Sequence, residues 1–209
     1  TSLKFQQALN ENGLDFNKFE KSPDNKVISI FRESPSPLQI IVDTRQTPPA
    51  QLTIIAPNPK TTKELFCDEV DAVISAYDKT WPAEKRQVIH TDGVVRELLE
   101  ASGDVIHAFQ ELWELRLKQP IDSLKIFGQP VRGGGLRFVL DPIPNNPDPV
   151  QIEVKIESYL QDTKKIFVET IFNWFSQGTI DPRKRITYMD DYLKERVYKF
   201  ILGETEDVQ

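Results

Sequence analysis

The sequence predicts an α+β protein in which antiparallel strands pack against long amphipathic helices. Two observations support this fold class. Short runs of β-branched residues are separated by proline-rich links that are too short for a parallel crossover, which indicates antiparallel neighbours. Longer segments carry apolar residues at helical spacing, which indicates helices that cover the strands. We expect a single α+β domain over 1–209, built from two similar βββα halves.

The first half of the chain begins with a short helix that Ser2 caps and that Gly13 ends. Three strands are then expected at 26–32, 38–43 and 51–56. The links SPSP and TRQTPPA separate them, because proline is excluded from strand interiors. These strands are apolar on both faces, so we expect each side of them to be covered.

A long helix, which Thr61 or Thr62 opens, follows the third strand and ends near residue 80. Thr61 and Glu64 predict a capping box, in which the two side chains satisfy free backbone N–H groups at the start of the helix. Apolar residues then recur at helical spacing from Leu65 to Trp81, and Pro82 lies beyond the end.

Between the two halves we expect a helical insert at 94–118, after a short strand at 86–91. The insert has two helical pieces, which are broken at Ser102–Gly103, and Pro120 marks its end. His107 falls off the apolar face of the second piece, so we expect it to be exposed.

The second half repeats the order of the first. Strands are expected at 123–127, 136–140 and 150–157, and the last of these alternates strictly between apolar and polar residues. A helix that Asp162 or Thr163 caps and that Gly178 ends is expected next, because apolar residues from Ile166 onward also fit a helical spacing. The halves 27–80 and 123–177 therefore suggest a duplicated βββα unit.

An amphipathic helix is expected at 188–202. Pro182 disfavours a helix that continues from the preceding one, so the chain can reverse there. We expect the C-terminal helix to pack on the Trp174–Phe175 side of the preceding helix. In the alternative interpretation, the aromatic residues of that segment meet another protein.

Composition restricts the classes of function. The 32 acidic and 26 basic residues give a net charge of −6, which disfavours nucleic acid as a partner. No apolar run approaches the roughly 18 residues that span a bilayer, so no membrane association is expected. The first residues lack the pattern of a secretory signal, and the single Cys67 excludes an internal disulfide and a cysteine-based zinc site. We interpret the protein as cytoplasmic.

One pattern suggests catalysis. Asp141 follows an expected strand, and Glu153 and Lys155 lie in IEVK on the next one. This arrangement resembles the PD-(D/E)xK family of metal-dependent nucleases. The resemblance implies that Asp141 and Glu153 hold a magnesium ion that activates water, and that Lys155 orients the nucleophile. The strict alternation offers another explanation, because the solvated face of any strand carries such residues.

Two further sets have weaker patterns. Gly133–Gly134–Gly135 could cradle a phosphate, but their expected place between two strands favours a hairpin turn. Cys67, His90 and Asp92 contain the ingredients of a nucleophilic pair, although no spacing links them. A lone cysteine is expected to be a small packing residue.

We therefore expect a non-enzymatic intracellular binding protein without a cofactor or metal site. Its partner is expected to be another protein or a second copy of the chain. The alternative is a magnesium-dependent nuclease that uses Asp141, Glu153 and Lys155. The two hypotheses differ in geometry, because a nuclease must bring the carboxylates of Asp141 and Glu153 to one metal ion.

Overall fold

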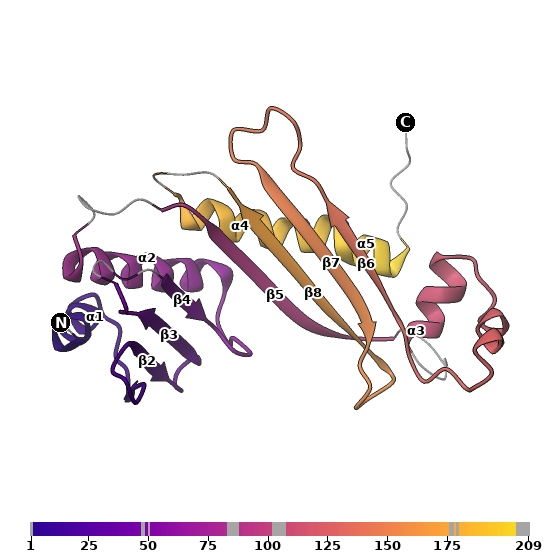
Figure 1. Ribbon diagram of the computed structural model, residues 1–209, viewed down its shortest axis with the longest axis horizontal. Helices are drawn as coiled ribbons and strands as arrows, with labels where there is room; N and C mark the ends of the chain where they lie inside the picture. Colours follow the sequence, from indigo (N-terminus) through magenta and orange to yellow (C-terminus); the bar gives the residue numbers. More distant parts are fainter. Residues whose placement is uncertain are drawn as a thin grey trace. The chain divides into compact units, whose positions relative to one another are not determined.

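The computed structural model describes residues 2–46, 49, 51–82, 88–101, 108–175, 178 and 180–203. These residues form two four-stranded antiparallel sheets with helices, which confirms the predicted α+β class (Figure 1). The chain divides into two compact units. Unit 1 comprises Thr1–Val88 with Thr179–Ile186, and unit 2 comprises Ile89–Gly178 with Thr187–Gln209. The prediction of one domain over 1–209 stays a prediction.

The sheet of unit 1, called sheet 1, has its strands in chain order. They are β1 (Lys18–Lys21), β2 (Val27–Arg32), β3 (Leu38–Asp43) and β4 (Gln51–Ile55), and each is antiparallel to the next. The three predicted strands are confirmed. The additional strand β1 has the sequence KFEK, which carries no apolar run, so it is stabilised by its pairing with β2 rather than by its own pattern.

Two helices cover one face of sheet 1, and both were predicted. They are α1 (Ser2–Glu11) and α2 (Lys63–Thr80). Of the two expected start residues, Thr62 is the N-cap of α2, since its hydroxyl accepts a hydrogen bond from the N–H of Leu65 at 3.3 Å. Alternate residues of β2 and β3 pack against these helices in a single buried cluster. Its largest fully buried members are Phe5, Leu9, Ile30, Ile40, Val42 and Val73.

The sheet of unit 2, called sheet 2, has the strand order β5-β8-β7-β6. Its strands are β5 (Thr91–Glu100), β6 (Gly135–Leu140), β7 (Val150–Ser158) and β8 (Lys165–Trp174), all antiparallel to their neighbours. The strict alternation of 150–157 correctly predicted β7, because Val150, Ile152, Val154 and Ile156 are buried and the residues between them are not.

The helix predicted from Asp162 to Gly178 is wrong, because this segment contains strand β8. Ile166, Val168, Phe172 and Trp174 all point into the core, at a spacing of two residues or multiples of two. Phe167 and Ile171 lie on the opposite face, and these extra apolar residues also complete a helical pattern. Asp162 is a turn residue instead of a cap, since its carbonyl accepts from the N–H of Lys165 at 2.9 Å.

The predicted helical insert 94–118 is also partly wrong. Residues 94–100 belong to β5, where Val94 and Leu98 face one side of the sheet and Val95 and Leu99 the other. These neighbouring apolar pairs fit a helix equally well, and pairing with β8 decides the outcome. The second piece is helical in α3 (Ala108–Glu111) and in a π-helical turn (Leu112–Arg116). Residues 102–107, with His107, lie outside the described residues.

The predictions of strands at 123–127 and at 86–91 also differ from the structure. The segment 123–127 lies in a 3₁₀-helix (Ile121–Phe127) instead of a strand, and its Ile126 and Phe127 are exposed. Pro120 directly precedes this helix in an extended conformation, and Gly128 ends the helix with a positive φ of 71°. In the predicted strand 86–91, the described residues 88–90 are not in a strand, and β5 begins only at Thr91.

The C-terminal helix is longer than predicted. It runs without a break through α4 (Pro182–Tyr192), a π-helical turn (Leu193–Val197) and α5 (Tyr198–Leu202). Pro182 does not interrupt this helix but begins it, because the first helical residue needs no backbone donor. Asp181 completes the start, since its carboxylate accepts from the N–H of Lys184 at 3.0 Å.

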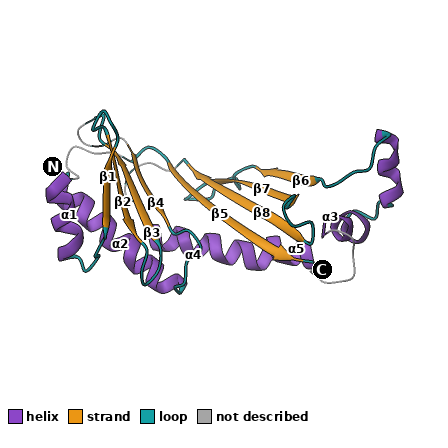
Figure 2. Cartoon of the chain, turned by 90° about the horizontal axis from the view of Figure 1, so that it is seen from below, coloured by secondary structure: helices purple, strands orange, loops and turns teal. Residues whose placement is uncertain are grey.

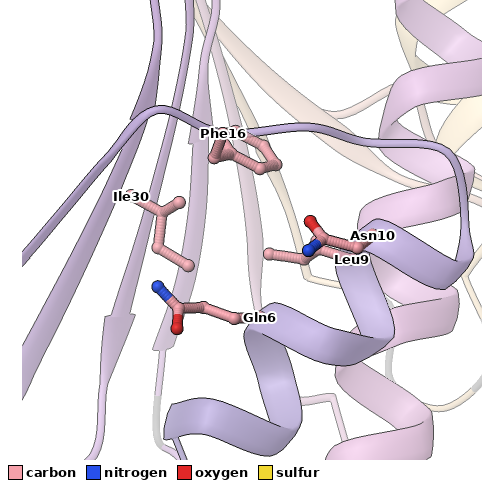
Figure 3. A pocket seen from close by; sticks show the side chains of 5 residues that line it. All are labelled: Gln6, Leu9, Asn10, Phe16 and Ile30. Carbon is pink, nitrogen blue, oxygen red and sulfur yellow. The ribbon is translucent and has the colours of Figure 1, made fainter.

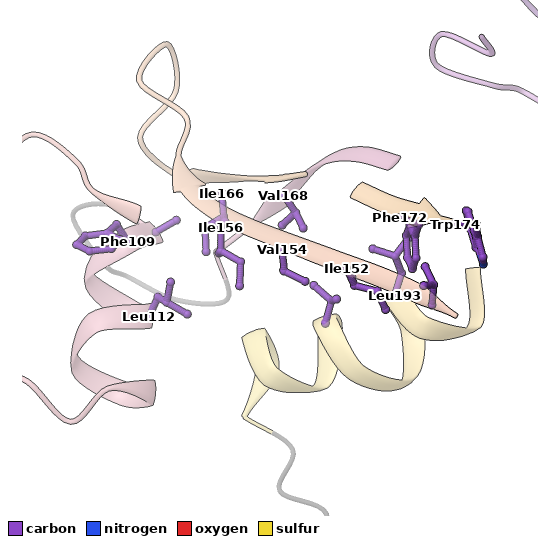
Figure 4. Close-up of a cluster of buried hydrophobic side chains, with 13 residues drawn as sticks. Phe109, Leu112, Ile152, Val154, Ile156, Ile166, Val168, Phe172, Trp174 and Leu193 are labelled. Carbon is purple, nitrogen blue, oxygen red and sulfur yellow. The ribbon is translucent and has the colours of Figure 1, made fainter. Parts of the chain in front are cut away.

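The C-terminal helix packs against the Trp174 end of sheet 2, and not against a helix as expected, because residues 165–174 form strand β8. The ring of Tyr188 lies edge-on to those of Phe172 and Trp174, and the ring of Tyr192 meets Phe172 at 5.7 Å. Figure 4 shows Leu193 beside this end of the buried cluster, with Phe109 and Leu112 at the other end. In the core of unit 2, side chains from α3, from the π-helical turn Leu112–Arg116 and from the C-terminal helix therefore pack against one face of sheet 2.

A three-stranded meander followed by a helix occurs twice along the chain. In unit 1 this is β2, β3, β4 and α2, close to the predicted half 27–80. The second such run is β6, β7, β8 and α4, so it covers 135–192 and not the predicted 123–177. The shift follows from the incorrect assignments of 123–127 and 162–177. A duplication of the βββα unit stays a prediction.

Candidate interaction surface

Sheet 2 has two faces of different character. Its inner face carries the apolar core, and the C-terminal helix runs along that side (Figure 2). Within the described residues of unit 2, no helix lies over the opposite side, which we call the outer face (Figure 2). Strand alternation and register place every second residue there. The outer face is composed of Asp92, Val94, Arg96, Leu98 and Glu100 on β5, Lys165, Phe167, Glu169, Ile171 and Asn173 on β8, Gln151, Glu153, Lys155 and Glu157 on β7, and Gly135, Arg137 and Val139 on β6.

A row of charged side chains crosses the outer face from one edge of the sheet to the other. Arg96 lies opposite Glu169, Glu169 opposite Lys155, and Lys155 opposite Arg137. We call these four residues, together with Glu153, the charged row. Directly opposite residues on neighbouring strands lie close enough for their side chains to interact. The register therefore brings together charges from all four strands.

Ion pairs connect the charged row. Glu169 accepts from Arg96 Nε at 2.6 Å and from Lys155 Nζ at 2.7 Å. Glu153 accepts from Arg137 Nη2 at 2.8 Å, and Lys155 Nζ lies 3.3 Å from its other oxygen. Each pair of neighbouring strands in sheet 2 is thus joined by at least one ion pair.

These contacts stabilise the charged forms of the side chains. Hydrogen bonds from Lys155 and then Arg96 lower the pKa of Glu169, and hydrogen bonding to Glu169 and Glu153 raises the pKa of Lys155. The hydrogen bond from Arg137 is the main cause of the lowered pKa of Glu153. The pKa values of Glu153, Lys155 and Glu169 are thus shifted away from neutral pH, whereas a general acid or base needs a pKa near it.

Apolar side chains lie on both sides of the charged row. Val94 lies opposite Ile171 on one side, and Leu98 lies opposite Phe167 on the other. Val94 is 44% exposed and Leu98 46% exposed, whereas Phe167 and Ile171 are half-buried. The outer face thus has two apolar patches separated by a row of paired charges.

The structure places the three residues of the nuclease pattern in different surroundings. Glu153 and Lys155 lie side by side in the charged row, where each is paired. Asp141 follows the end of β6 and is exposed, and it makes no hydrogen bond or ion pair with any described residue. Lys155 pairs with Glu169 rather than facing an open carboxylate site.

Among the described residues, no group of three or more His, Cys, Asp or Glu side chains is arranged to hold a metal ion.

The residues of the charged row that sequence reasoning missed are Arg96, Arg137 and Glu169. Glu169 and Arg96 were assigned to helices. The many β-branched and aromatic residues of β8 were the signal that could have indicated a strand there.

The three glycines at the start of β6, Gly133, Gly134 and Gly135, serve close packing. A Cβ at Gly134 would lie 2.9 Å from the ring of Phe109. A Cβ at Gly133 would lie 2.7 Å from the Cβ of Ser158. The N–H of Gly134 donates to the hydroxyl of Ser158 at 3.0 Å, so it is not directed at an anion site. The segment leads from a 3₁₀-helix into β6, so the expected hairpin between two strands is wrong.

The candidate nucleophilic residues have separate roles. Cys67 is buried in α2, and burial raises the pKa of its thiol, which opposes formation of a reactive thiolate. The Nε2 atom of His90 contacts a carboxylate oxygen of Asp92, and the ring of His90 lies 5.7 Å from the ring of Phe175. The buried state of Cys67 agrees with the expected packing role.

A pocket of about 170 Å³ lies in unit 1 between α1 and the sheet (Figure 3). Gln6, Leu9, Asn10, Phe16 and Ile30 line it. Small-molecule sites usually have volumes of about 300–1,000 Å³, so this pocket is small for a ligand.

None of the described helices is long and apolar enough to cross a membrane.

Comparisons with known proteins do not assign a family. The sequence matches no protein-family model, and no curated protein matches it. The chain is similar in part to the crystal structure of the Saccharomyces cerevisiae Ran-binding protein Mog1p, with 14% identity over 88% of this chain and 95% of that chain. The TM-score is 0.23, which is too low to indicate a common fold.

Proposed function

We propose that this protein is a non-enzymatic binding module that contacts a partner protein through the outer face of sheet 2. The observation that carries the proposal is the arrangement of two exposed apolar patches around a row of ion-paired side chains. Protein interfaces combine apolar contact area with polar groups whose hydrogen bonds are satisfied.

The pairing within the charged row favours burial by a partner. An isolated charge loses its hydration when it is covered, and this costs much free energy unless an opposite charge compensates it. Glu169 and Lys155 already compensate each other at 2.7 Å. A partner can therefore cover the centre of this face without leaving a charge unpaired.

The exposed charges indicate the chemistry of the partner. The side chains of Arg96 and Arg137, at the two ends of the row, are each 64% exposed. A guanidinium group has five N–H donors, so each arginine retains donors beyond its ion pair. We infer a partner surface with apolar side chains over the Val94 and Leu98 patches and a carboxylate that accepts from Arg96. Because acidic and basic residues are nearly balanced on this face, nucleic acid is a poor match.

The test compares two surfaces of the same chain. The immobilised protein captures proteins from a lysate of its source, and each captured protein is purified and titrated by calorimetry. We expect Val94→Asp with Leu98→Asp to weaken binding by about tenfold or more, because acidic groups would replace the apolar patches. Leu65→Asp is the matched control, since Leu65 is an exposed apolar residue of α2 in unit 1.

Two outcomes would overturn the proposal. One is that every captured protein binds the Val94→Asp/Leu98→Asp variant as tightly as the parent. The other is that magnesium or manganese raises the melting temperature and that Glu153→Ala abolishes the rise, since a ligand of the native state stabilises it by mass action. The second result would favour the nuclease hypothesis instead.

A further inference from the structure

Strand β6 is an open edge of sheet 2. It pairs with β7 on one side, and on its other side no described strand is paired with it. Five of its six residues are exposed, including Phe138 at 39%, Val139 at 56% and Leu140 at 38%. An open edge with exposed apolar residues is a template for pairing with another strand.

The two edges of sheet 2 are protected to different degrees. The opposite edge, β5, carries Asp92, Arg96, Glu97 and Glu100, and charged residues of this kind discourage edge-to-edge contact. Within β6 the only charged residue is Arg137, and its guanidinium is drawn toward Glu153 on β7. Proline, a second common protection, is also missing from β6.

The backbone of β6 has donors and acceptors directed at the open side. The N–H of Ser158 donates to the carbonyl of Gly134 at 2.9 Å, so Gly134 points its backbone toward β7. Backbone direction alternates along an antiparallel strand, and Leu136, Phe138 and Leu140 therefore point the same way. The backbone N–H and C=O groups of Arg137 and Val139 therefore point away from β7, in the plane of the sheet, toward its unpaired edge.

We propose that β6 pairs antiparallel with β6 of a second copy of this chain, with Val139 opposite Val139 on the two-fold axis. This register places Phe138 opposite Leu140 of the second copy, on the inner side of both sheets. On the outer side it places Arg137 opposite Asp141 of the second copy. The strand then extends by one residue to Asp141, and the two sheets form one continuous eight-stranded sheet.

Charge complementarity selects this register and this occupant. Asp141 is exposed and has no ion-pair partner among the described residues, and the second copy supplies one through Arg137. Centring the pairing on Arg137 would place two arginines opposite each other, which destabilises a strand pair. Centring it on Phe138 would place Arg137 opposite Val139 and would leave Asp141 unpaired. A symmetric contact requires a self-complementary patch, and the sequence from Arg137 to Asp141 is one.

The test is the oligomeric state of the full chain, measured by sedimentation and by light scattering over a range of concentrations. We expect a dimer, and we expect Val139→Lys to weaken it by about tenfold or more because two lysines would meet on the axis. Val94→Lys, on the opposite edge β5, is the matched control and should leave the dimer unchanged. Thermal unfolding verifies that each variant is folded.

Charge exchange gives a test that does not depend on the Val139 variant. Arg137→Asp and Asp141→Arg should each be monomeric alone, because like charges would face each other. A mixture of the two variants should form a heterodimer, since each Asp then meets an Arg. A parent chain that stays monomeric at all concentrations, or a dimer that none of these changes affects, would overturn the proposal. The inference is independent of the proposed partner on the outer face, because no partner protein is needed to test it.

Discussion

In unit 1, two helices cover the inner face of a sheet, and among the described residues no ion pair joins two of its strands. In unit 2, the C-terminal helix and α3 cover the inner face, and ion pairs join every pair of neighbouring strands on the outer face. Both inner faces use the same principle, because alternate aliphatic residues of the central strands are almost completely buried.

The difference between the two sheets concerns their outer faces. On sheet 1 this face presents half-buried residues such as Val27 and Ile41, and its ion pairs join residues that are close in sequence, Lys18 with Glu20 and Asp43 with Arg45. On sheet 2 the charges lie at the centre and are held by partners on other strands. Cross-strand pairs fix side-chain positions, so the outer face of sheet 2 offers a defined pattern to a partner.

The largest expected effect comes from removing the C-terminal helix. Deletion of residues 187–209 removes Leu193 and Val197 from the core of unit 2, and each large apolar side chain contributes on the order of 1.5–3 kcal/mol of burial. We expect the inner face of sheet 2 to bind a hydrophobic dye and to lose protection from hydrogen exchange, whereas β2 and β3 keep theirs. Equal protection of both sheets in the truncated chain would show that the helix does not stabilise unit 2.

The next effect compares matching positions in the two cores. Ile40 in β3 and Ile156 in β7 are both almost completely buried, so replacing either with Ala should lower the free energy of unfolding by about 2–4 kcal/mol. Glu157→Ala, on the outer face beside Ile156, should cost less than about 1 kcal/mol. Denaturant titrations of the three variants give these values. Similar losses at Ile156 and Glu157 would contradict the register of β7.

A smaller effect, of opposite sign, is expected at Thr170. This residue of β8 is fully buried, and its hydroxyl has no hydrogen-bond partner among the described residues. Burying an unsatisfied hydroxyl is unfavourable, and valine has almost the same shape without it. Thr170→Val should therefore raise the free energy of unfolding by about 1 kcal/mol, whereas Thr170→Ala should lower it by leaving a cavity. Destabilisation by both changes would indicate that the hydroxyl has a partner.

The smallest effect concerns Glu97, a charged residue on the inner face of β5. Burial is the main cause that raises its pKa above the ordinary value of 4.5, and Asp190 of α4 contributes to the rise, whereas Lys194 opposes it. At a pH between the pKa of Glu97 in the unfolded state and its higher pKa in the native state, the native state binds more protons. The free energy of unfolding therefore falls as the pH rises through the native pKa. Glu97→Gln should be more stable than the parent near pH 7 and similar to it near pH 4.

Thermal unfolding at the two pH values measures this difference. Glu100→Gln is a suitable control, because Glu100 lies on the exposed side of the same strand. A Glu97→Gln variant that is less stable than the parent at both pH values would contradict the inferred penalty for the buried carboxylate.

The sequence predicted those elements whose pattern fits only one period. In β7, apolar and polar residues alternate without exception, and in α2 the apolar residues recur only at helical spacing, so both were assigned correctly. In β8, Phe167 and Ile171 on the outer face add apolar residues to those of the core. That pattern satisfies both periods, so the spacing of the apolar residues alone could not distinguish a helix from a strand.

The candidate surface depended on the tertiary structure for a similar reason. The sequence by itself determined that Glu153 and Lys155 lie on the polar side of a strand, because alternation is a local property. Their partners are not local. Arg96 and Glu169 are 73 positions apart, and only the pairing of β5 with β8 brings them together. Strand pairing is decided by the sum of contacts across the whole sheet, and no short segment contains that information.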